Sequence, residues 1–147
     1  MGLLEGEREL NSETIGRHLI IDGTSSRTCI LNDEAQLARL LNEVIGLAGM
    51  EILVPAKMVR VELNPDKTTE TGGDDGGVTG VAILSTSHVS IHTWPLTNRF
   101  AFDLYSCRDF QTIQIFNRLK ERLGIVDAIV QSTARKTPKP GSGILWQ

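Results

Sequence analysis

Three strand-like segments follow one another along the middle of the chain with very short links between them. They cover 78–84, 89–94 and 99–106, and each is rich in β-branched or aromatic residues and bounded by turn-forming residues such as Pro95 and Asn98. Links this short join antiparallel neighbours, because a parallel crossover needs a dozen or more residues. The centre of the chain is therefore predicted to be an antiparallel sheet.

Two other segments carry the three- and four-residue periodicity of amphipathic helices. The first is 33–48, where Asn32 or Asp33 can cap the start of the helix. The second is 109–123, which Asp109 is expected to cap. The apolar stripe of this second helix is predicted to contain Ile113, Phe116, Leu119 and Leu123.

The remaining strand-like segments are 15–22, 52–63 and 125–131, which gives the order β-α-β-β-β-β-α-β. Two helices are too few to cover both faces of a parallel sheet. The expected fold class is α+β, a two-layer sandwich in which a mainly antiparallel sheet carries both helices on one face. A length of 147 residues fits a single domain over 1–147. A homodimer is one way to cover the other face, and Trp146 is a candidate to dock back on the body.

Composition excludes several functional classes. The formal net charge is −3, the isoelectric point is near 5.6 and aromatic residues make up 5% of the chain, so we expect no nucleic-acid partner. We also expect no membrane association, because no apolar stretch approaches the 18 residues or so of a spanning helix. The polar N-terminal residues do not resemble a signal peptide, so a cytoplasmic location with free Cys29 and Cys107 thiols is expected.

An unusual polar run, S-T-S-H-V-S-I-H-T-W-P, occupies residues 85–95. On a strand, Ser90, His92 and Trp94 would share one face, and His88 would join them. The residues alone leave three interpretations open. The strand can simply face water, it can hold a two-histidine metal site that lacks a third ligand, or it can belong to a serine hydrolase that lacks the usual G-x-S-x-G turn.

The letters of this run carry more information than its spacing. S-H-V-S-I-H-T-W-P, which starts at Ser87, resembles the signature of the bacterial and archaeal S-adenosylmethionine decarboxylases. Three further matches flank it: G-R-H-L-I at 16–20, G-V-T-G-V at 77–81 and F-D-L-Y-S-C at 102–107. The chain therefore resembles the prokaryotic S-adenosylmethionine decarboxylase proenzyme family over roughly residues 15–132.

The resemblance implies a pyruvoyl-dependent carboxy-lyase that makes its own cofactor. Ser87 would be the precursor of the pyruvoyl group, which forms a Schiff base with the substrate amine, and self-cleavage between Thr86 and Ser87 would give a β chain 1–86 and an α chain 87–147. His92 would act as the processing base and Thr79 as the processing hydroxyl. Cys107 would donate the proton to the product carbon. The resemblance implies no metal, and it implies a homodimer of processed protomers with each catalytic site near the subunit interface.

Four positions depart from the family pattern. Thr86 replaces a glutamate before the processed serine, and Arg108 replaces a glycine. Leu96 stands where the family has the glutamate that holds the ribose hydroxyls, and the stretch 72–75 lacks the ring that stacks on adenine. A substrate shifted to L-ornithine or L-arginine, in polyamine synthesis, is therefore expected. The alternative is a true S-adenosylmethionine decarboxylase for spermidine synthesis.

The acidic loop between 66 and 77 has two interpretations. Its composition is typical of a solvated hairpin loop, but Glu70, Asp74 and Asp75 are also candidates to bind the cationic end of a small amino-acid substrate. A different class of function remains open as well. Thr86, Leu96 and Arg108 are compatible with a non-catalytic homologue that is never processed and pairs with an active enzyme.

Overall fold

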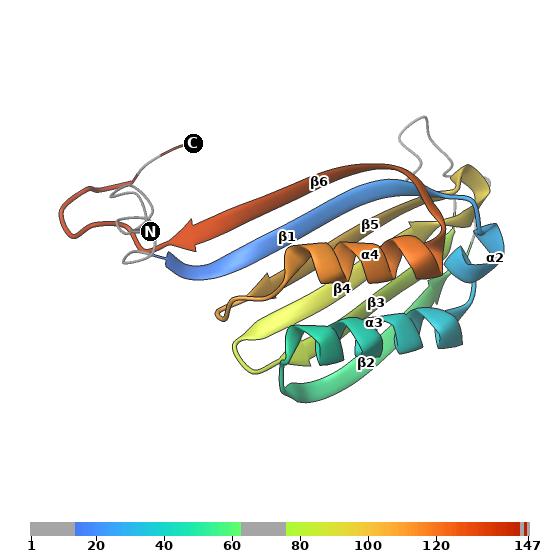
Figure 1. Ribbon diagram of the computed structural model, residues 1–147, viewed down its shortest axis with the longest axis horizontal. Helices are drawn as coiled ribbons and strands as arrows, with labels where there is room; N and C mark the ends of the chain where they lie inside the picture. Colours follow the sequence, from blue (N-terminus) through green and yellow to red (C-terminus); the bar gives the residue numbers. More distant parts are fainter. Residues whose placement is uncertain (1–13, 63–75, 145, 147) are drawn as a thin grey trace.

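A six-stranded antiparallel sheet forms the centre of the computed structural model, which describes residues 14–62, 76–144 and 146 (Figure 1). Its strands are β1 (Thr14–Ser25), β2 (Ile52–Val61), β3 (Gly77–Leu84), β4 (Ser87–Trp94), β5 (Arg99–Ser106) and β6 (Ile125–Lys136). Their order across the sheet is β2-β3-β4-β5-β1-β6, and every neighbouring pair is antiparallel. The predicted antiparallel sheet is confirmed.

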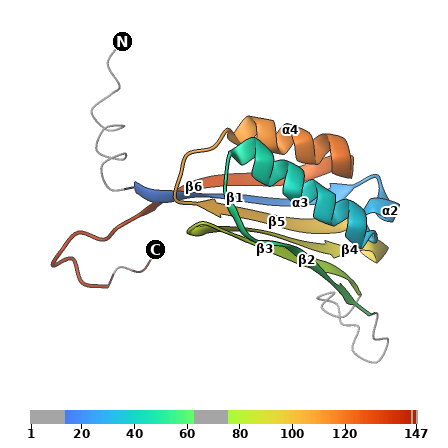
Figure 2. The same ribbon diagram turned by 90° about the horizontal axis from the view of Figure 1, so that it is seen from below.

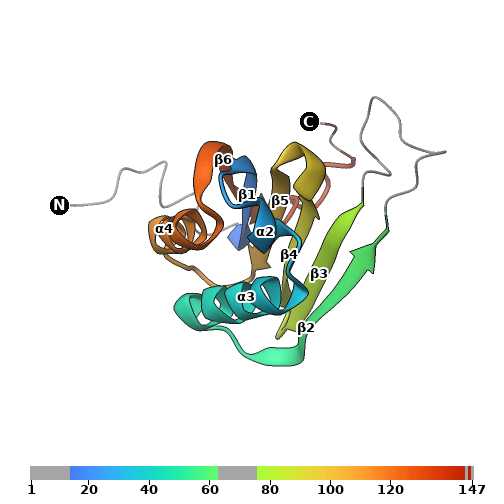
Figure 3. The same ribbon diagram turned by 90° about the vertical axis from the view of Figure 1, so that its right-hand side faces the viewer.

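The two long helices lie side by side on one face of this sheet (Figures 2 and 3). They are α3 (Glu34–Ala48) and α4 (Thr112–Leu123), while the short α2 (Thr28–Leu31) and the 3₁₀ turn η1 (Pro95–Thr97) lie at one end of the strands. No helix of the described residues covers the opposite face, which we call the open face. The two-layer α+β architecture predicted from the sequence is confirmed.

The hydrophobic core fills the space between the sheet and the two helices. Alternate strand residues such as Leu19, Ile21, Val89 and Ile91 are fully buried on the helix side, as the two-residue period of a strand requires. The helices contribute Leu37, Leu40, Leu41, Val44 and Ile45 from α3, and Ile115, Leu119 and Leu123 from α4.

Helix α3 begins and ends as its sequence predicts. The Asp33 carboxylate accepts a hydrogen bond from the Gln36 backbone N–H at 3.0 Å, which is the arrangement of an N-cap. Gly49 ends the helix in the left-handed conformation, with φ of 66°. The capping role of Asp33 is therefore confirmed.

The start and the phase of α4 differ from the prediction. The helix begins at Thr112 after Gln111, so Asp109 is not its cap; the Asp109 carboxylate instead lies 3.4 Å from Arg17 Nε. Phe110 is buried against the core, and the chain turns into the helix only after this anchor. The helix is consequently rotated relative to the expected stripe, so Ile115 is buried and Ile113 is 70% exposed.

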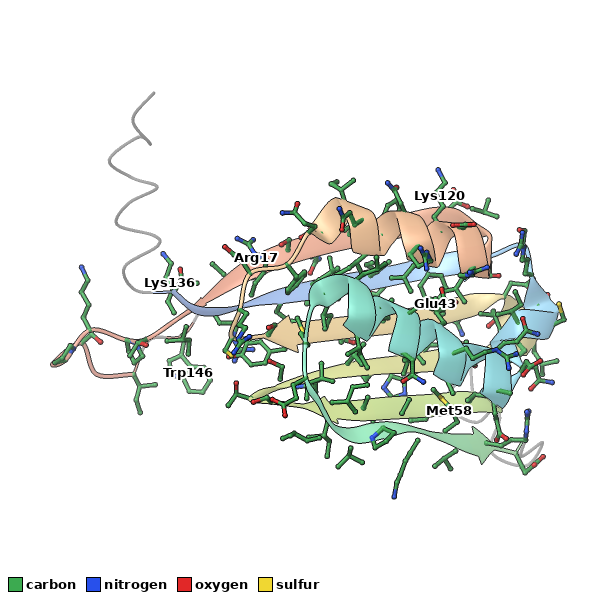
Figure 4. All side chains as sticks on the ribbon, turned by 60° about the horizontal axis from the view of Figure 1, so that its bottom comes forward. Arg17, Glu43, Met58, Lys120, Lys136 and Trp146 are labelled. Carbon is green, nitrogen blue, oxygen red and sulfur yellow. The ribbon has the colours of Figure 1, made fainter. Side chains whose placement is uncertain are left out.

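Three smaller differences concern the ends of elements. β1 and β6 extend well beyond their predicted limits, to Ser25 and Lys136, because they pair along almost their whole length. Trp146 does not dock on the body and is 95% exposed (Figure 4). The short helix α2 was not predicted. Within the described ranges, none of the helices has the length and apolarity needed to cross a membrane.

Candidate active site

A tight turn connects β3 to β4 at the bond where cleavage is expected. Leu84 pairs with Ser87, so only Ser85 and Thr86 form the turn, and two-residue hairpin turns require positive φ angles. Thr86 has φ of 55°, a left-handed conformation that is strained for a β-branched residue. The backbone strain in this hairpin is therefore located next to the Thr86–Ser87 peptide bond.

Ser87 and Cys107 lie next to each other at the same end of the sheet. Ser87 is 9% exposed, and its hydroxyl oxygen accepts a hydrogen bond from the Cys107 backbone N–H at 3.3 Å. The β4–β5 register, in which His88 pairs with Tyr105, places Cys107 opposite Thr86 when it is continued by two residues. Cys107 Sγ accordingly lies 2.8 Å from Thr86 Oγ1.

The Cys107 thiol is exposed, unlike a cysteine that only fills the core. The hydrogen bond between this thiol and the Thr86 hydroxyl has the largest influence on the pKa of Cys107 and lowers it below the ordinary value. Partial desolvation opposes this effect, while the Ser87 hydroxyl and the charge of Arg108 add to it. The site thus holds a thiol whose proton is easier to remove than that of a free cysteine.

Thr79 and His92 form a second group on the open face. The two residues are directly paired across β3 and β4, and Thr79 Oγ1 is hydrogen-bonded to His92 Nδ1 at 3.1 Å. The ring of Trp94 is tilted toward the His92 imidazole, with centroids 6.4 Å apart. On the open face, His92 therefore contacts Thr79 on the neighbouring strand β3 and Trp94 two residues further along its own strand.

Gly77 of the G-V-T-G-V motif allows close packing against the strand residue next to His92. A Cβ on Gly77 would lie 1.9 Å from the Thr93 carbonyl oxygen, and its φ of 142° is rarely adopted by other residues. The Thr93 hydroxyl donates to the Leu31 carbonyl at 2.6 Å and accepts from the Val78 N–H at 3.0 Å. These contacts fix the segment that carries His92.

The structure does not bring the two groups together within one chain. Ser87 points toward the helix side, whereas His92 belongs to the open face, since residues of opposite parity on a strand face opposite sides. The five residue steps from Ser87 to His92 span about 16 Å of strand. Ser87 and Cys107 are therefore adjacent, and Thr79 and His92 are adjacent, but the pairs are separated.

Sequence reasoning missed a polar cluster in the middle of the open face. His18 Nε2 lies 2.9 Å from Asp103 Oδ1, and the Tyr105 ring packs between the imidazoles of His18 and His88. All four residues belong to the quoted motifs, but only the strand register shows that they meet. In the described part of the chain, no group of three or more metal-ligating side chains is present.

The predicted substrate-binding residues can be placed only in part. Glu70, Asp74 and Asp75 lie outside the described residues, as does the segment 72–75. Leu96 is 68% exposed and lines a hollow of about 210 Å³ together with Glu62. A larger cavity of about 580 Å³ opens beside Trp94 and includes Asp22 and Asp127 in its wall.

A comparison with protein families finds one matching model. It describes S-adenosylmethionine decarboxylase, and the match covers residues 17–136. That range includes Thr79, Thr86, Ser87, His92 and Cys107.

Similar proteins carry two different names. The S-adenosylmethionine decarboxylase proenzyme of Prochlorococcus marinus (strain MIT 9313) is 32% identical over 126 residues, which cover 84% of this chain and 90% of that protein. The arginine decarboxylase proenzyme of Ignicoccus hospitalis is 29% identical over 134 residues, covering 90% and 85%. The solved adenosylmethionine decarboxylase of Aquifex aeolicus is similar in fold, with a TM-score of 0.66, 21% identity and coverage of 90% and 99%.

Proposed function

This chain belongs to the S-adenosylmethionine decarboxylase family, and on that premise we propose that it is a self-processing, pyruvoyl-dependent amino-acid decarboxylase of polyamine synthesis. The relatives described above are named as decarboxylase proenzymes. The observation that carries the proposal is the contact of Ser87 and Cys107 at the strained Thr86 turn. A precursor serine and a proton donor are the two groups that this chemistry needs in one place.

Processing would begin with attack of the Ser87 hydroxyl on the Thr86 carbonyl carbon, which converts the peptide bond into an ester. Removal of the Ser87 α-proton then expels the Thr86 carboxylate by β-elimination. Hydrolysis of the resulting dehydroalanine releases ammonia and leaves a pyruvoyl group on the chain 87–147. The left-handed φ of Thr86 supports this step, because opening the turn releases backbone strain.

The residues around Ser87 fit a serine-derived pyruvoyl group. Such a group supplies a ketone that reacts with the substrate amine and withdraws electrons as carbon dioxide leaves. The Cys107 backbone N–H, which is hydrogen-bonded to the Ser87 hydroxyl oxygen, would remain next to residue 87 after processing and could orient the pyruvoyl group by hydrogen bonding. The Cys107 thiol, which lies 2.8 Å from the Thr86 hydroxyl beside the proposed cleavage site, would protonate the substrate carbon in place of the lost carboxylate.

A homodimer would complete the site. His92 and Thr79 are too far from Ser87 in the same chain to remove its α-proton. In a dimer formed through the open faces, the partner's His92 would act as the processing base, with the partner's Thr79 as its hydrogen-bonded hydroxyl. The exposed apolar side chains on that face, which include Val59, Val81 and Ile83, support its burial by a second copy.

The substrate is proposed to be L-ornithine or L-arginine. Leu96 cannot accept hydrogen bonds from ribose hydroxyls, and its side chain is 68% exposed at that position. Glu70, Asp74 and Asp75 remain the proposed partners of the cationic substrate end. S-adenosylmethionine stays the second candidate, because the Prochlorococcus relative is named for it.

The first experiment is a denaturing mass spectrum of freshly purified protein. We expect two fragments that meet at Thr86/Ser87, the second of which gains mass on borohydride reduction of its ketone. Ser87→Ala should remain intact, whereas Ser85→Ala, in the same turn, should be cleaved. A single uncleaved wild-type chain that persists for days would contradict the proposal and favour the non-catalytic homologue.

The second experiment assigns the substrate. Processed protein is incubated separately with carboxyl-labelled L-ornithine, L-arginine and S-adenosylmethionine, and labelled carbon dioxide is collected. Release from one of the two basic amino acids supports the proposed shift. Release from S-adenosylmethionine alone would overturn the shift while keeping the enzyme class.

A further inference from the structure

We propose that the free edge of β6 is a self-complementary surface that pairs, antiparallel, with β6 of a second copy. The two-fold axis would pass through Gln131 of both chains. This interface is separate from the open-face dimer proposed above, and it depends on neither Ser87 nor His92. It would join two six-stranded sheets into one continuous sheet.

β6 is the last strand of the sheet, and among the described residues nothing pairs with its outer edge (Figure 1). The strand is long, contains no proline and is exposed along almost its whole length. Val126, Ile129 and Val130 are 64%, 65% and 43% exposed. Soluble proteins usually protect such edges with charges, prolines or bulges, because an unprotected edge adds another strand. In β6 the register irregularities and the charged residues lie near the two ends, and the segment 128–134 between them has neither.

The symmetry of the pairing restricts its register. In an antiparallel pair, two residues that face each other either both direct their N–H and C=O groups toward the partner strand or both direct them away from it. The two orientations alternate from one residue to the next along each strand. Two copies of the same strand related by a two-fold axis therefore pair residues whose numbers add up to an even sum, so the axis passes through a residue. Only a few such registers overlap most of β6.

Charge selects one of these registers. The segment 128–134 carries no charged residue, and Asp127 and Arg135 stand just outside its two ends. Centring the pair on Gln131 places Asp127 of each copy opposite Arg135 of the other, on the same face of the joined sheet. A shift of the axis by one residue in either direction removes both oppositely charged pairs.

The side chains between these charges also fit. Ala128 would face Ala134, and Val130 would face Ser132, so no bulky pair is forced together. The Arg135 guanidinium now lies over the Tyr105 ring at 5.4 Å. It would turn toward Asp127 of the second copy, exchanging an exposed cation–π contact for an ion pair that lies directly across the ladder.

Disulfide scanning tests the register. Gln131→Cys is made in a Cys29→Ser chain, where the two Cα atoms of a self-pair would be about 4.5 or 5.5 Å apart, within the range of a disulfide. Thr133→Cys is the matched control, because its two copies would be offset by about 13 Å. We expect a linked dimer on oxidation for Gln131→Cys only. Equal linking of both variants, or no linking of Gln131→Cys, overturns the proposal.

A charge swap tests the contact itself. Native mass spectrometry should show half as many chains per particle for Arg135→Glu as for the wild type, and Asp127→Lys with Arg135→Glu should restore the larger particle. The proposal is overturned if the wild-type particle contains no more chains than that of Arg135→Glu. It is also overturned if the double variant does not restore the larger particle. Intact mass of each variant reports cleavage at Ser87, so failure of the edge and failure of the proposed function are distinguished.

Discussion

One hydroxyl group, that of Thr86, has the largest influence on the pKa of the Cys107 thiol. It lies 2.8 Å from the sulfur and belongs to the residue whose carbonyl would be cleaved. The same hydroxyl is 2.7 Å from the Ser85 carbonyl oxygen, so its proton has two acceptors within reach. At this position the family usually has a glutamate, whose charge would act on the thiol in the opposite direction.

Removing this hydroxyl should raise the pKa of Cys107. Because Thr86 is the largest cause of the lowered pKa, Thr86→Ala should move the thiol back toward its ordinary value, and Thr86→Ser should leave it low. The thiolate is the form that reacts, so alkylation of Thr86→Ala at neutral pH should be several-fold slower. The measurement is the rate of iodoacetamide labelling against pH, in a Cys29→Ser, Ser87→Ala chain that cannot be cleaved.

The Thr86→Ser variant is the control for changes in the turn. If the alanine variant keeps the pH profile of the Thr86 chain, the hydroxyl has no influence on the thiol. If the alanine and serine variants both shift from that profile by the same amount, the effect belongs to the β-branched methyl group instead.

Between elements, Glu43 is the side chain that joins the two long helices (Figure 4). Its Oε2 accepts hydrogen bonds from Arg118 Nη1 at 2.9 Å and from Arg122 Nε at 3.1 Å. These bonds lower the pKa of Glu43 below its ordinary value. A carboxylate whose folded pKa is lowered contributes stability above its unfolded pKa and loses it as the pH falls through the folded pKa.

Glu43→Gln should therefore destabilise the fold by about 1 kcal/mol at pH 7, and by progressively less as the pH falls from the ordinary glutamate pKa of about 4.3 through the lower folded pKa of Glu43. Urea unfolding at several pH values measures the difference. Glu121→Gln is the control, because this carboxylate lies 3.9 Å from Arg118 Nε on the same helix and should cost less. A loss in Glu43→Gln that does not depend on pH would contradict the electrostatic explanation.

Two glycines should respond to alanine in opposite ways. Gly77→Ala would force a Cβ to 1.9 Å from the Thr93 carbonyl oxygen and should cost about 3 kcal/mol or more. Gly46 lies within α3, where a Cβ meets nothing within 4 Å, so Gly46→Ala should stabilise the fold by about 0.5–1 kcal/mol. Thermal unfolding of both variants tests the pair, and an undiminished stability of Gly77→Ala would contradict the close approach of Gly77 to the Thr93 carbonyl oxygen.

The sequence predicts the elements well where a local pattern decides them. The helix over 33–48 and its Asp33 cap follow from apolar spacing and one capping residue. The start of α4 could not be predicted, because it depends on the burial of Phe110, a tertiary contact that leaves no local pattern. The full length of β6 also depends on its pairing with β1, which lies more than a hundred residues earlier in the chain.

At the scale of the whole molecule, the separation of Ser87 from His92 would make the proposed processing a two-chain reaction. Co-expressed Ser87→Ala and His92→Ala chains should form mixed dimers in which one intact Ser87 meets the partner's intact His92. In those dimers the His92→Ala chain should be cleaved at Ser87, and the Ser87→Ala chain should not. Intact mass of the mixture, compared with each variant expressed alone, measures this complementation.

The opposite result would be equally clear. If the His92→Ala chain remains uncleaved in verified mixed dimers, or is cleaved when it is expressed alone, the partner's His92 is not the processing base. A Cys29→Ser chain gives a control, because Cys29 is exposed and lies in neither group.

The candidate site shows where sequence reasoning ends. The alternation of β4 correctly predicts that Ser90, His92 and Trp94 share a face, because that depends only on the strand period. The neighbours of each residue depend on register instead. Thr79 meets His92, and Thr86 meets Cys107, through pairings that a single sequence does not reveal.

The position of the proposed cut, in a two-residue turn between paired strands, has a consequence for how the mature protein persists. The hydrogen-bond ladder between β3 and β4 would survive the cut, so the folded state would lose little. Refolding, however, would change from a unimolecular to a bimolecular process, since 1–86 and 87–147 would first have to meet. Maturation would thus make unfolding hard to reverse at low concentration, and the lifetime of the enzyme would depend on its unfolding rate.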